Sequence, residues 1–432
     1  MKTLALQPLS KPFDVTLAPP GSKSLTNRAL VVAALANGRC TLRNVLFADD
    51  TQVMIESLRR LGFELEIDEQ ARQVTVNGRA GAIPSDRAEL MCGNSGTTIR
   101  FLAALCTLGR GEYRLDGVER MRQRPIGELV DLLRNLAARV QYEGAEGYPP
   151  VRVLADGLAG GRVRFGAAQS SQYLSAVLMA APYARHEVRV DLDPEQTSWP
   201  YIAMTMRLMT DFGVFVELER DRDTGQPRRI VVPGDRYHAT DYTIEPDASA
   251  ATYWLAAAAI HPGAKVTIPG LGRKSLQGDV AFADVLHQMG ADLVFGDDFI
   301  TLIGTDRLEG IDVDLSAMPD TAQTLAAIAV FADGPSTLRG LRTLRVKETD
   351  RLAALQNELT RLGATARIDG DTLHITPPAA VKPAQIATYD DHRMAMSFAV
   401  VGTRASGIVI EDPQCVNKTY PQFFEDLEKL RA

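Results

Sequence analysis

Three short segments place hydroxyl, amide and basic side chains at the expected start of an apolar helix. They are residues 21–28 (GSKSLTNR), 93–98 (GNSGTT) and 170–172 (SSQ). Free backbone N–H groups and the helix macrodipole favour anions at such positions, and glycine lets a ligand approach the backbone closely. Each segment alone is also typical of a capped surface turn. Three donor-rich helix starts in one half of the chain indicate a shared anionic ligand.

The other half of the chain carries charged clusters. Residues 345–351 (RVKETDR) are typical of a solvated helix face with ion pairs, whereas residues 390–393 (DDHR) head an apolar helix. An arginine in such a helix needs an anionic partner or water, and Lys418 adds another cation. Asp247 is interpreted as a helix N-cap. The sequence does not decide whether Asp320 caps a helix or takes part in the chemistry of the site.

The elements that must position these residues recur six times. A glycine, or His186 in the third repeat, begins a β-type run at Gly38, Gly111, His186, Gly263, Gly334 and Gly407, a period of about 72 residues, or 432 divided by six. Each marker follows an Ala-rich helix that opens on a capping residue: Ser24, Ser95, Ser170, Asp247, Asp320 or Asp390. An amphipathic helix comes next, and five of these lead into a hairpin. We therefore predict an α/β protein whose unit is strand, buried helix, strand, exposed helix and two strands.

The ends of the chain suggest how the repeats group into domains. The sixth repeat stops after its second helix, and the strands TLALQ and FDVTLA within residues 1–20 are available to complete it. We predict two domains of three repeats each. The first comprises residues 21–237, and the second comprises residues 1–20 together with 238–432, with the N-terminal arm completing the last repeat.

Composition excludes several classes of protein. The chain has 432 residues, 45% of them hydrophobic, and a formal net charge of −7, which disfavours disorder and a general nucleic-acid binder. The cysteines lie far apart, so we expect free thiols and no metal site: Cys40, Cys92, Cys106 and Cys415. No apolar run approaches the roughly 18 residues of a membrane span, and the N-terminus lacks a signal-peptide pattern. We expect a cytoplasmic protein.

These motifs, in this order, resemble the EPSP synthase family of enolpyruvyl transferases from about Pro19 to the C-terminus. The resemblance also rests on residues 124–134 (RPIGELVDLLR) and 417–427 (NKTYPQFFEDL). It implies two similar domains, each of three βαβαββ units in an inside-out α/β barrel, which close over a cleft. It implies transfer of the enolpyruvyl group of phosphoenolpyruvate to the 5-hydroxyl of shikimate 3-phosphate, with release of phosphate, on the shikimate route to chorismate and aromatic amino acids.

The resemblance also implies partners and site residues. It implies a monomer with small-molecule substrates, no metal or organic cofactor, and no nucleic-acid or membrane partner. The residues implied for shikimate 3-phosphate are Lys23, Ser24, Arg28, Ser170, Ser171, Gln172, Ser198, Tyr201, Asp320, Thr343 and Lys347. Those implied for phosphoenolpyruvate are Lys23, Gly96, Arg124, Gln172, Arg351, Arg393 and Lys418. Asp320 and Glu348 would be the acid–base pair, assisted by Lys23. Both substrates are polyanions, which suits bidentate arginine and lysine.

Some positions depart from the family pattern. Thr343 stands where the family often has asparagine, and Phe101 where it often has proline; Ser95 and Ile99 also differ from the commonest bacterial form. Gly96 is retained. The resemblance therefore predicts sensitivity to glyphosate, which occupies the phosphoenolpyruvate site of the family.

Two alternatives stay open. A UDP-N-acetylglucosamine enolpyruvyl transferase would share the repeats, but it would show GxKN in place of GSKS and usually a reactive cysteine before the RP segment. Residues 117–125 (GVERMRQRP) contain no cysteine. A sixfold-repeat clamp or scaffold would need basic helices around its bore, whereas helices such as QFFEDLEKL are mixed or acidic.

Overall fold

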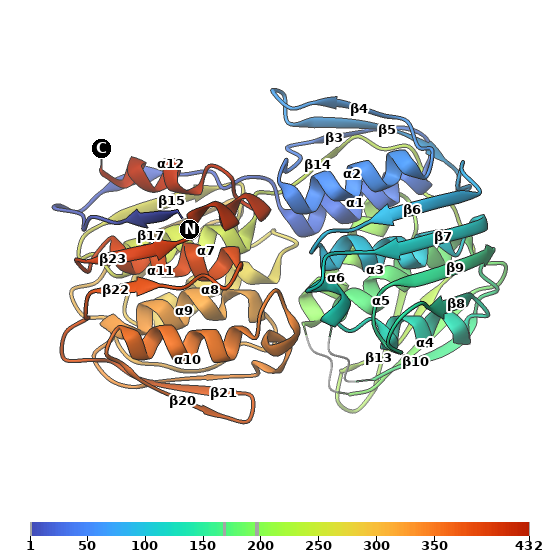
Figure 1. Cartoon of the computed structure of the whole chain (residues 1–432). Helices are drawn as coiled ribbons and strands as arrows, with labels where there is room; N and C mark the ends of the chain where they lie inside the picture. Colours follow the sequence, from blue (N-terminus) through green and yellow to red (C-terminus); the bar gives the residue numbers. More distant parts are fainter. Residues whose placement is uncertain (1, 167–169, 195–197, 432) are drawn as a thin grey trace. The chain divides into compact units, whose positions relative to one another are not determined.

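The computed structural model describes residues 2–166, 170–194 and 198–431. The chain divides into two compact units (Figure 1), a first unit of Gly21–Ile244 and a second unit of Met1–Pro20 with Glu245–Ala432. Each unit is an α/β repeat structure, as the sequence predicts.

The first unit contains helices and three four-stranded sheets. Its helices are α1 (Lys23–Leu35), α2 (Asp49–Arg60), α3 (Gly96–Cys106), α4 (Gly127–Asn135), α5 (Ser171–Ala180) and α6 (Trp199–Asp211). Its first sheet has the order β14 (Tyr242–Thr243), β3 (Asn37–Arg43), β5 (Gln73–Arg79), β4 (Leu65–Asp68). The second has β6 (Arg87–Met91), β7 (Arg110–Asp116), β9 (Val151–Asp156), β8 (Arg139–Tyr142). The third has β10 (Gly161–Phe165), β11 (Val188–Leu192), β13 (Pro227–Val232), β12 (Glu217–Arg220).

The second unit repeats this plan with a shorter last sheet. Its helices are α7 (Ala248–Ala259), α8 (Phe282–Gln288), α9 (Ala322–Ile328), α10 (Arg351–Arg361), α11 (His392–Gly402) and α12 (Phe423–Glu428). One sheet has the order β16 (Asp292–Phe295), β17 (Phe299–Ile303), β15 (Lys265–Pro269), β2 (Asp14–Thr16). The next has β18 (Asp312–Asp314), β19 (Ser336–Arg339), β21 (Thr372–Thr376), β20 (Thr365–Asp369). The three-stranded sheet has β1 (Thr3–Ala5), β23 (Ile408–Glu411), β22 (Ala384–Ile386).

Within a repeat, two parallel strands flank a buried helix and an antiparallel hairpin completes the sheet. In the second repeat, Leu90 of β6 pairs with Leu115 of the parallel β7, and Tyr113 of β7 pairs with Val153 of the antiparallel β9. The buried helices α1, α3 and α5 contact one another in the first unit, as α7, α9 and α11 do in the second. Apolar helices at the centre of each unit, with sheets around them (Figure 1), give the inside-out α/β architecture.

The N-terminal arm is shared between two sheets, which corrects the prediction that it completes only the last repeat. β1 does join the last sheet, where Leu4 pairs with Ile410 of β23. β2 instead pairs in parallel with β15, Val15 opposite Val266. The fourth repeat enters α7 with no preceding strand of its own, so β2 fills the position that the first strand occupies in other repeats.

The boundary between the units also falls later than the sequence suggested. The predicted break lies between residues 237 and 238, whereas the structure divides the chain between Ile244 and Glu245. The reason is β14, whose Tyr242 pairs in parallel with Leu42 of β3. The first repeat begins directly at α1, and β14 supplies its missing first strand.

Helix capping follows the sequence at three of six predicted positions: Ser95, Ser170 and Asp247 accept hydrogen bonds from backbone N–H groups at the starts of α3, α5 and α7. α11 is capped by Asp391, one residue after the predicted Asp390. α1 is capped by Ser22 instead of Ser24, so Lys23 becomes its first residue. Asp320 caps no helix and lies inside the 3-10 turn η4 (Pro319–Thr321). Its side chain is therefore available for other contacts.

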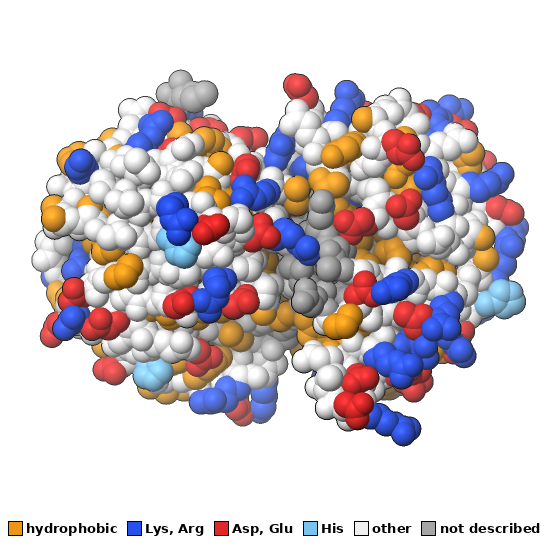
Figure 2. Space-filling model, turned by 90° about the horizontal axis from the view of Figure 1, so that it is seen from below, with side chains coloured by type: hydrophobic (Ala, Val, Ile, Leu, Met, Phe, Trp, Pro, Cys, Tyr) orange, Lys and Arg blue, Asp and Glu red, His pale blue; other side chains and the backbone are white. Residues whose placement is uncertain are grey.

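The face in Figure 2 carries mixed charge: basic and acidic side chains are interspersed, and its described residues form no continuous basic stripe. A DNA clamp would need such a stripe on its surface. No helix in the described ranges is both long and apolar enough to span a bilayer.

Candidate active site

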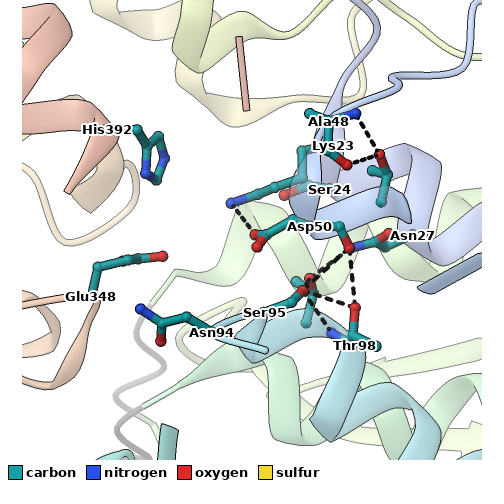
Figure 3. Close-up of polar contacts among 12 residues, drawn as sticks. Lys23, Ser24, Asn27, Ala48, Asp50, Asn94, Ser95, Thr98, Glu348 and His392 are labelled. Carbon is teal, nitrogen blue, oxygen red and sulfur yellow. Dashed lines mark hydrogen bonds and ion pairs between the residues drawn. The ribbon is translucent and has the colours of Figure 1, made fainter. Parts of the chain in front are cut away.

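The start of α1 presents a paired lysine. Lys23 Nζ lies 3.4 Å from Asp50 Oδ2 at the start of α2, and the two side chains are 13% and 5% exposed (Figure 3). The Asp50 carbonyl accepts hydrogen bonds from Ser95 Oγ at 3.4 Å and Thr98 Oγ1 at 3.3 Å. Asp50 therefore links the lysine of the first segment to the helix start of the second.

The start of α3 holds a buried arginine against a glycine. Arg124 Nη1 donates to the Asn94 carbonyl at 2.8 Å and to Asn94 Oδ1 at 3.1 Å. A Cβ atom on Gly96 would lie 2.7 Å from Arg124 Nη2 and 3.3 Å from Arg100 Nη1. Glycine is thus required if both guanidinium groups are to keep these positions.

The start of α5 receives a neighbouring arginine. Ser170 Oγ accepts from the Gln172 N–H at 3.3 Å, and Gln172 Oε1 accepts from Arg100 Nη1 at 2.7 Å. The Arg100 guanidinium also stacks on Tyr173, 5.0 Å from the ring centroid. Because the Gln172 amide oxygen accepts the hydrogen bond from Arg100, the NH₂ group of the same amide is directed away from that arginine.

Arg28 lies deeper than the other cations of the first unit. It is fully buried, and its donors reach Thr205 Oγ1 at 2.7 Å, the Ser24 carbonyl at 2.9 Å and Ser175 Oγ at 3.2 Å. Every one of these acceptors is neutral. Burial lowers the pKa of Arg28 to about 10, a direction that the nearby Tyr201 opposes only weakly.

The remaining residues expected in this unit lie at two helix starts. Ser171 opens α5 and is buried. Ser198 is the N-cap residue of α6 in a left-handed conformation at φ 58°. Tyr201 lies in the first turn of α6, and its carbonyl accepts from Thr205 Oγ1 at 2.8 Å. The Tyr201–Thr205 contact connects α6 to the surroundings of Arg28.

The second unit brings its charged motifs together around Asp320. Three cations of the described chain reach this carboxylate: Lys347 Nζ at 3.3 Å and Arg351 Nη1 at 3.2 Å from Oδ1, and Arg393 Nη2 at 3.0 Å from Oδ2. The RVKETDR and DDHR segments, far apart in sequence, therefore converge on one acid. This arrangement concentrates both signs of charge in a partly buried place, where electrostatic interactions are strong.

Arg351 is the centre of this cluster. It is 1% exposed, and besides Asp320 it contacts Glu348 Oε2 at 2.9 Å and Asp391 Oδ2 at 2.7 Å. Burial alone would lower the pKa of Arg351, but the carboxylates of Asp391, Glu348 and Asp320 outweigh it and raise that pKa. The interpretation of residues 345–351 (RVKETDR) as a solvated helix face is wrong, because Arg351 and Glu348 are both buried.

Two further expected residues lie on 3-10 turns of the second unit. Thr343 belongs to η6 (Arg342–Val346) and is 3% exposed, and its Oγ1 makes no hydrogen bond to the described residues. Lys418 ends η7 (Pro413–Lys418), also buried, and its charge opposes the rise in the pKa of Asp390 that burial causes.

The structure adds residues that were not among the expected site residues, one of which, Asp391, lies in the DDHR segment. Asp50 and Asp391 pair with Lys23 and Arg351, and Arg100 pairs with Gln172. A signal existed for Arg100, which interrupts an apolar helix as Arg393 does. The first-turn acid Asp50 carried no such signal, because acids are ordinary at helix starts.

One more buried carboxyl lies near the cluster. Asp279, in η3 (Gly278–Ala281), accepts a short hydrogen bond from Ser249 Oγ of α7. Burial, followed by the negative charge of Asp320, raises the pKa of Asp279 to about 6. No cluster of three or more His, Cys, Asp or Glu side chains suited to a metal occurs within the described ranges.

Comparison with known proteins identifies the family of this chain. A sequence model of the family described as EPSP synthase (3-phosphoshikimate 1-carboxyvinyltransferase) matches residues 9–427. A protein of Trichormus variabilis named 3-phosphoshikimate 1-carboxyvinyltransferase is 45% identical over 100% of this chain and 99% of its own. One of Nostoc punctiforme with the same name is 46% identical over 98% of each chain.

Solved structures show the same fold. EPSP synthase from Acinetobacter baumannii superposes with a TM-score of 0.82 at 26% identity, covering 100% of this chain and 98% of that one. The enolpyruvyl transferase NikO from Streptomyces tendae has a TM-score of 0.76 at 18% identity, which indicates a shared fold only. The match to the EPSP synthase family agrees with the GSKS and RVKETDRL motifs of this chain. The alternative, a UDP-N-acetylglucosamine enolpyruvyl transferase, does not. The chain belongs to the EPSP synthase (3-phosphoshikimate 1-carboxyvinyltransferase) family.

Proposed function

We propose that this chain transfers the enolpyruvyl group of phosphoenolpyruvate to the 5-hydroxyl of shikimate 3-phosphate and releases phosphate. The enzyme class follows from membership of the family and from relatives of about 45% identity over the full chain that carry the name 3-phosphoshikimate 1-carboxyvinyltransferase. The reaction belongs to the shikimate route to chorismate and aromatic amino acids.

The observation that carries the assignment of roles is the cluster around Asp320. Addition joins the 5-hydroxyl oxygen to C2 of phosphoenolpyruvate, while one proton leaves the hydroxyl and one reaches the methylene carbon. Elimination breaks the C–O bond to phosphate and removes a proton from the new methyl group. Asp320 and Glu348 share Arg351 as an ion-pair partner. We propose that these two acids move the protons, since positioned carboxyl groups suit such steps.

The cations bind the substrate anions in this proposal. For shikimate 3-phosphate we assign Lys23, Ser24, Arg28, Ser170, Ser171, Gln172, Ser198, Tyr201, Asp320, Thr343 and Lys347. For phosphoenolpyruvate we assign Lys23, Gly96, Arg124, Gln172, Arg351, Arg393 and Lys418. The support for Lys23, Gly96 and Ser171 is that α1, α3 and α5 begin at these residues, where backbone N–H groups and helix dipoles favour anions.

Lys23 assists catalysis in the same proposal. Its ammonium is partly buried beside Asp50, which holds it in place. A cation fixed in this way stabilises negative charge that develops during addition, at no cost of reorganisation when the reaction occurs.

The test is phosphate release from shikimate 3-phosphate and phosphoenolpyruvate by wild type, Asp320→Asn and Glu348→Gln. We expect kcat to fall by about 10² to 10⁴-fold in each variant, because each loses one proton-transfer group. Asp369→Asn is the matched control, since Asp369 lies in the same unit but is 66% exposed and pairs with Arg367 in a hairpin.

Two results would contradict the proposal. Undiminished turnover in both variants would remove the acid–base assignment. A wild type that accepts UDP-N-acetylglucosamine and ignores shikimate 3-phosphate would remove the substrate assignment.

We further propose that the chain acts as a monomer in the cytoplasm. The small-molecule chemistry of the family supports this, and gel filtration with light scattering on the purified protein measures the oligomeric state. A mass of twice 47.0 kDa would contradict it.

A further inference from the structure

Arg28 stacks on an aromatic ring in the core of the first unit. Its guanidinium carbon lies 5.1 Å from the centroid of the Phe101 ring. The two residues come from the buried helices α1 and α3, and they are 0% and 1% exposed. Cation–π attraction is strongest in such desolvated surroundings.

The ring matters because Arg28 is otherwise held only by neutral groups. Among the described residues its hydrogen bonds go to Thr205, Ser24, Ser175 and the Tyr201 carbonyl, and no carboxylate pairs with it. A buried cation without an anion is costly. The negative face of the Phe101 ring therefore supplies compensation that hydroxyl and carbonyl dipoles supply only in part.

The two kinds of contact act at different places on the guanidinium. Hydrogen bonds at the edge of the planar guanidinium resist rotation within its plane, because all its N–H groups point outward in that plane. The Phe101 ring lies under the guanidinium carbon and attracts its charge at a place that no hydrogen bond occupies. An aliphatic side chain of similar volume fills the space but offers no attraction to the charge.

We propose that Phe101 is a positioning residue for shikimate 3-phosphate, whose ring holds Arg28 in the orientation that binds this anion. The inference rests on the proposed function, because it requires Arg28 to be a substrate contact. The ring acts through Arg28 and touches no reacting atom.

The experiment replaces Phe101 by 4-fluoro-, 3,5-difluoro- and 3,4,5-trifluorophenylalanine, and separately by leucine. Fluorination weakens the negative face of the ring with little change in its size. We expect KM and the calorimetric Kd for shikimate 3-phosphate to rise stepwise with fluorination, reaching about five- to tenfold in Phe101→Leu. We expect kcat and the KM for phosphoenolpyruvate to stay within about twofold, because only the population of correctly oriented Arg28 changes.

Phe63→Leu is the control, since Phe63 is 3% exposed in the same unit and none of the described cations stacks on its ring. It should destabilise the fold without changing the affinity for shikimate 3-phosphate. Affinity that is flat across the fluorinated series overturns the inference, even if Phe101→Leu binds poorly or misfolds. A wild type that neither binds nor turns over shikimate 3-phosphate overturns the proposed function, and the inference with it.

Discussion

Arg28 and Arg351 are both completely buried, yet their surroundings are opposite. Arg28, in the first unit, contacts hydroxyl groups, carbonyl groups and the Phe101 ring. Arg351, in the second unit, contacts the carboxylates of Asp320, Glu348 and Asp391. Burial accordingly lowers the pKa of Arg28 to about 10, whereas the carboxylates raise the pKa of Arg351 in spite of burial.

The difference separates two uses of a buried cation. Arg351 pairs with carboxylates within the protein, so it holds the acids beside it in fixed positions. Arg28 has no protein anion among the described residues, so an anionic ligand would find its charge uncompensated. An arginine lined by neutral groups therefore keeps its full charge for an anion, whereas one lined by carboxylates also fixes the positions of those carboxylates.

The largest expected effect is that of Arg351→Met. The substitution leaves the three carboxylates without their common cation, and we expect the free energy of unfolding to fall by about 3 to 5 kcal/mol. Denaturant titration at pH 7 measures it. Arg367→Met is the matched control, because Arg367 pairs with Asp369 at the surface and should change stability by less than about 0.5 kcal/mol. Equal losses in the two variants would contradict the central role of Arg351.

Arg28→Met should separate binding from stability. No carboxylate remains behind, and Ser175 Oγ and Thr205 Oγ1 already lie 2.8 Å apart, so the fold should lose less than in Arg351→Met. Affinity for shikimate 3-phosphate should fall about 100-fold, the loss of a charge-assisted contact with an anion. Calorimetry of substrate binding, together with unfolding, checks both halves. Unfolding as severe as that of Arg351→Met would erase the contrast between the two arginines.

Asp279→Asn tests a buried carboxyl group. In contrast to the two arginine variants, it is expected to increase the free energy of unfolding. Burial raises the pKa of Asp279 from 3.8 to about 6, so the folded state holds this proton more tightly than the unfolded state. The stability this group contributes is complete below about pH 4 and is lost as the pH rises through 6. The advantage of Asp279→Asn over wild type should therefore grow from small near pH 4.5 to about 2 to 3 kcal/mol at pH 7.

Ser249→Ala provides the opposite change at the same place. It removes the hydroxyl that donates to Asp279. Its stability loss should be greater at pH 7, where the carboxylate is charged, than at pH 4.5. Unfolding curves at both pH values measure this, and a loss independent of pH would show that Asp279 does not titrate in this range.

The smallest effect is expected for Gly96→Ala. The new Cβ would stand 2.7 Å from Arg124 Nη2, the far end of a flexible side chain, so the guanidinium shifts while the fold survives. We expect the KM for phosphoenolpyruvate to rise about tenfold and glyphosate inhibition to weaken. Gly144→Ala is the control, since its Cβ meets only Pro150 at an ordinary 3.6 Å. Glyphosate inhibition of Gly96→Ala as strong as that of wild type would contradict the expectation that the new Cβ crowds this site.

The sequence predicted features that depend on a few neighbouring residues. Ser95 and Ser170 cap α3 and α5 because a cap needs only a side-chain acceptor and the N–H group two or three residues ahead. The alternation of buried and exposed helices follows in the same way from local apolar periodicity. The roles of the site residues stay predictions that the mutations above test.

Features that depend on distant partners were decided by the fold. Asp320 resembled a helix cap in sequence, yet its side chain pairs with Lys347, Arg351 and Arg393. Asp50 became the partner of Lys23, and β2 joined β15 instead of the last sheet. Local sequence patterns predict where a helix begins and which of its faces is apolar. They do not predict which helix N-termini lie next to one another in the fold.

The sequence by itself determined the sixfold α/β repeat, the caps of α3, α5 and α7, and the family. Only the tertiary structure decided that Arg28 meets neutral groups and a ring while Arg351 meets three carboxylates. In sequence both are basic residues of helices, Arg28 in the second turn of α1 and Arg351 at the first position of α10. Their charges differ in effect because electrostatic energy depends on which groups the packing brings within a few ångströms and on how completely it excludes water.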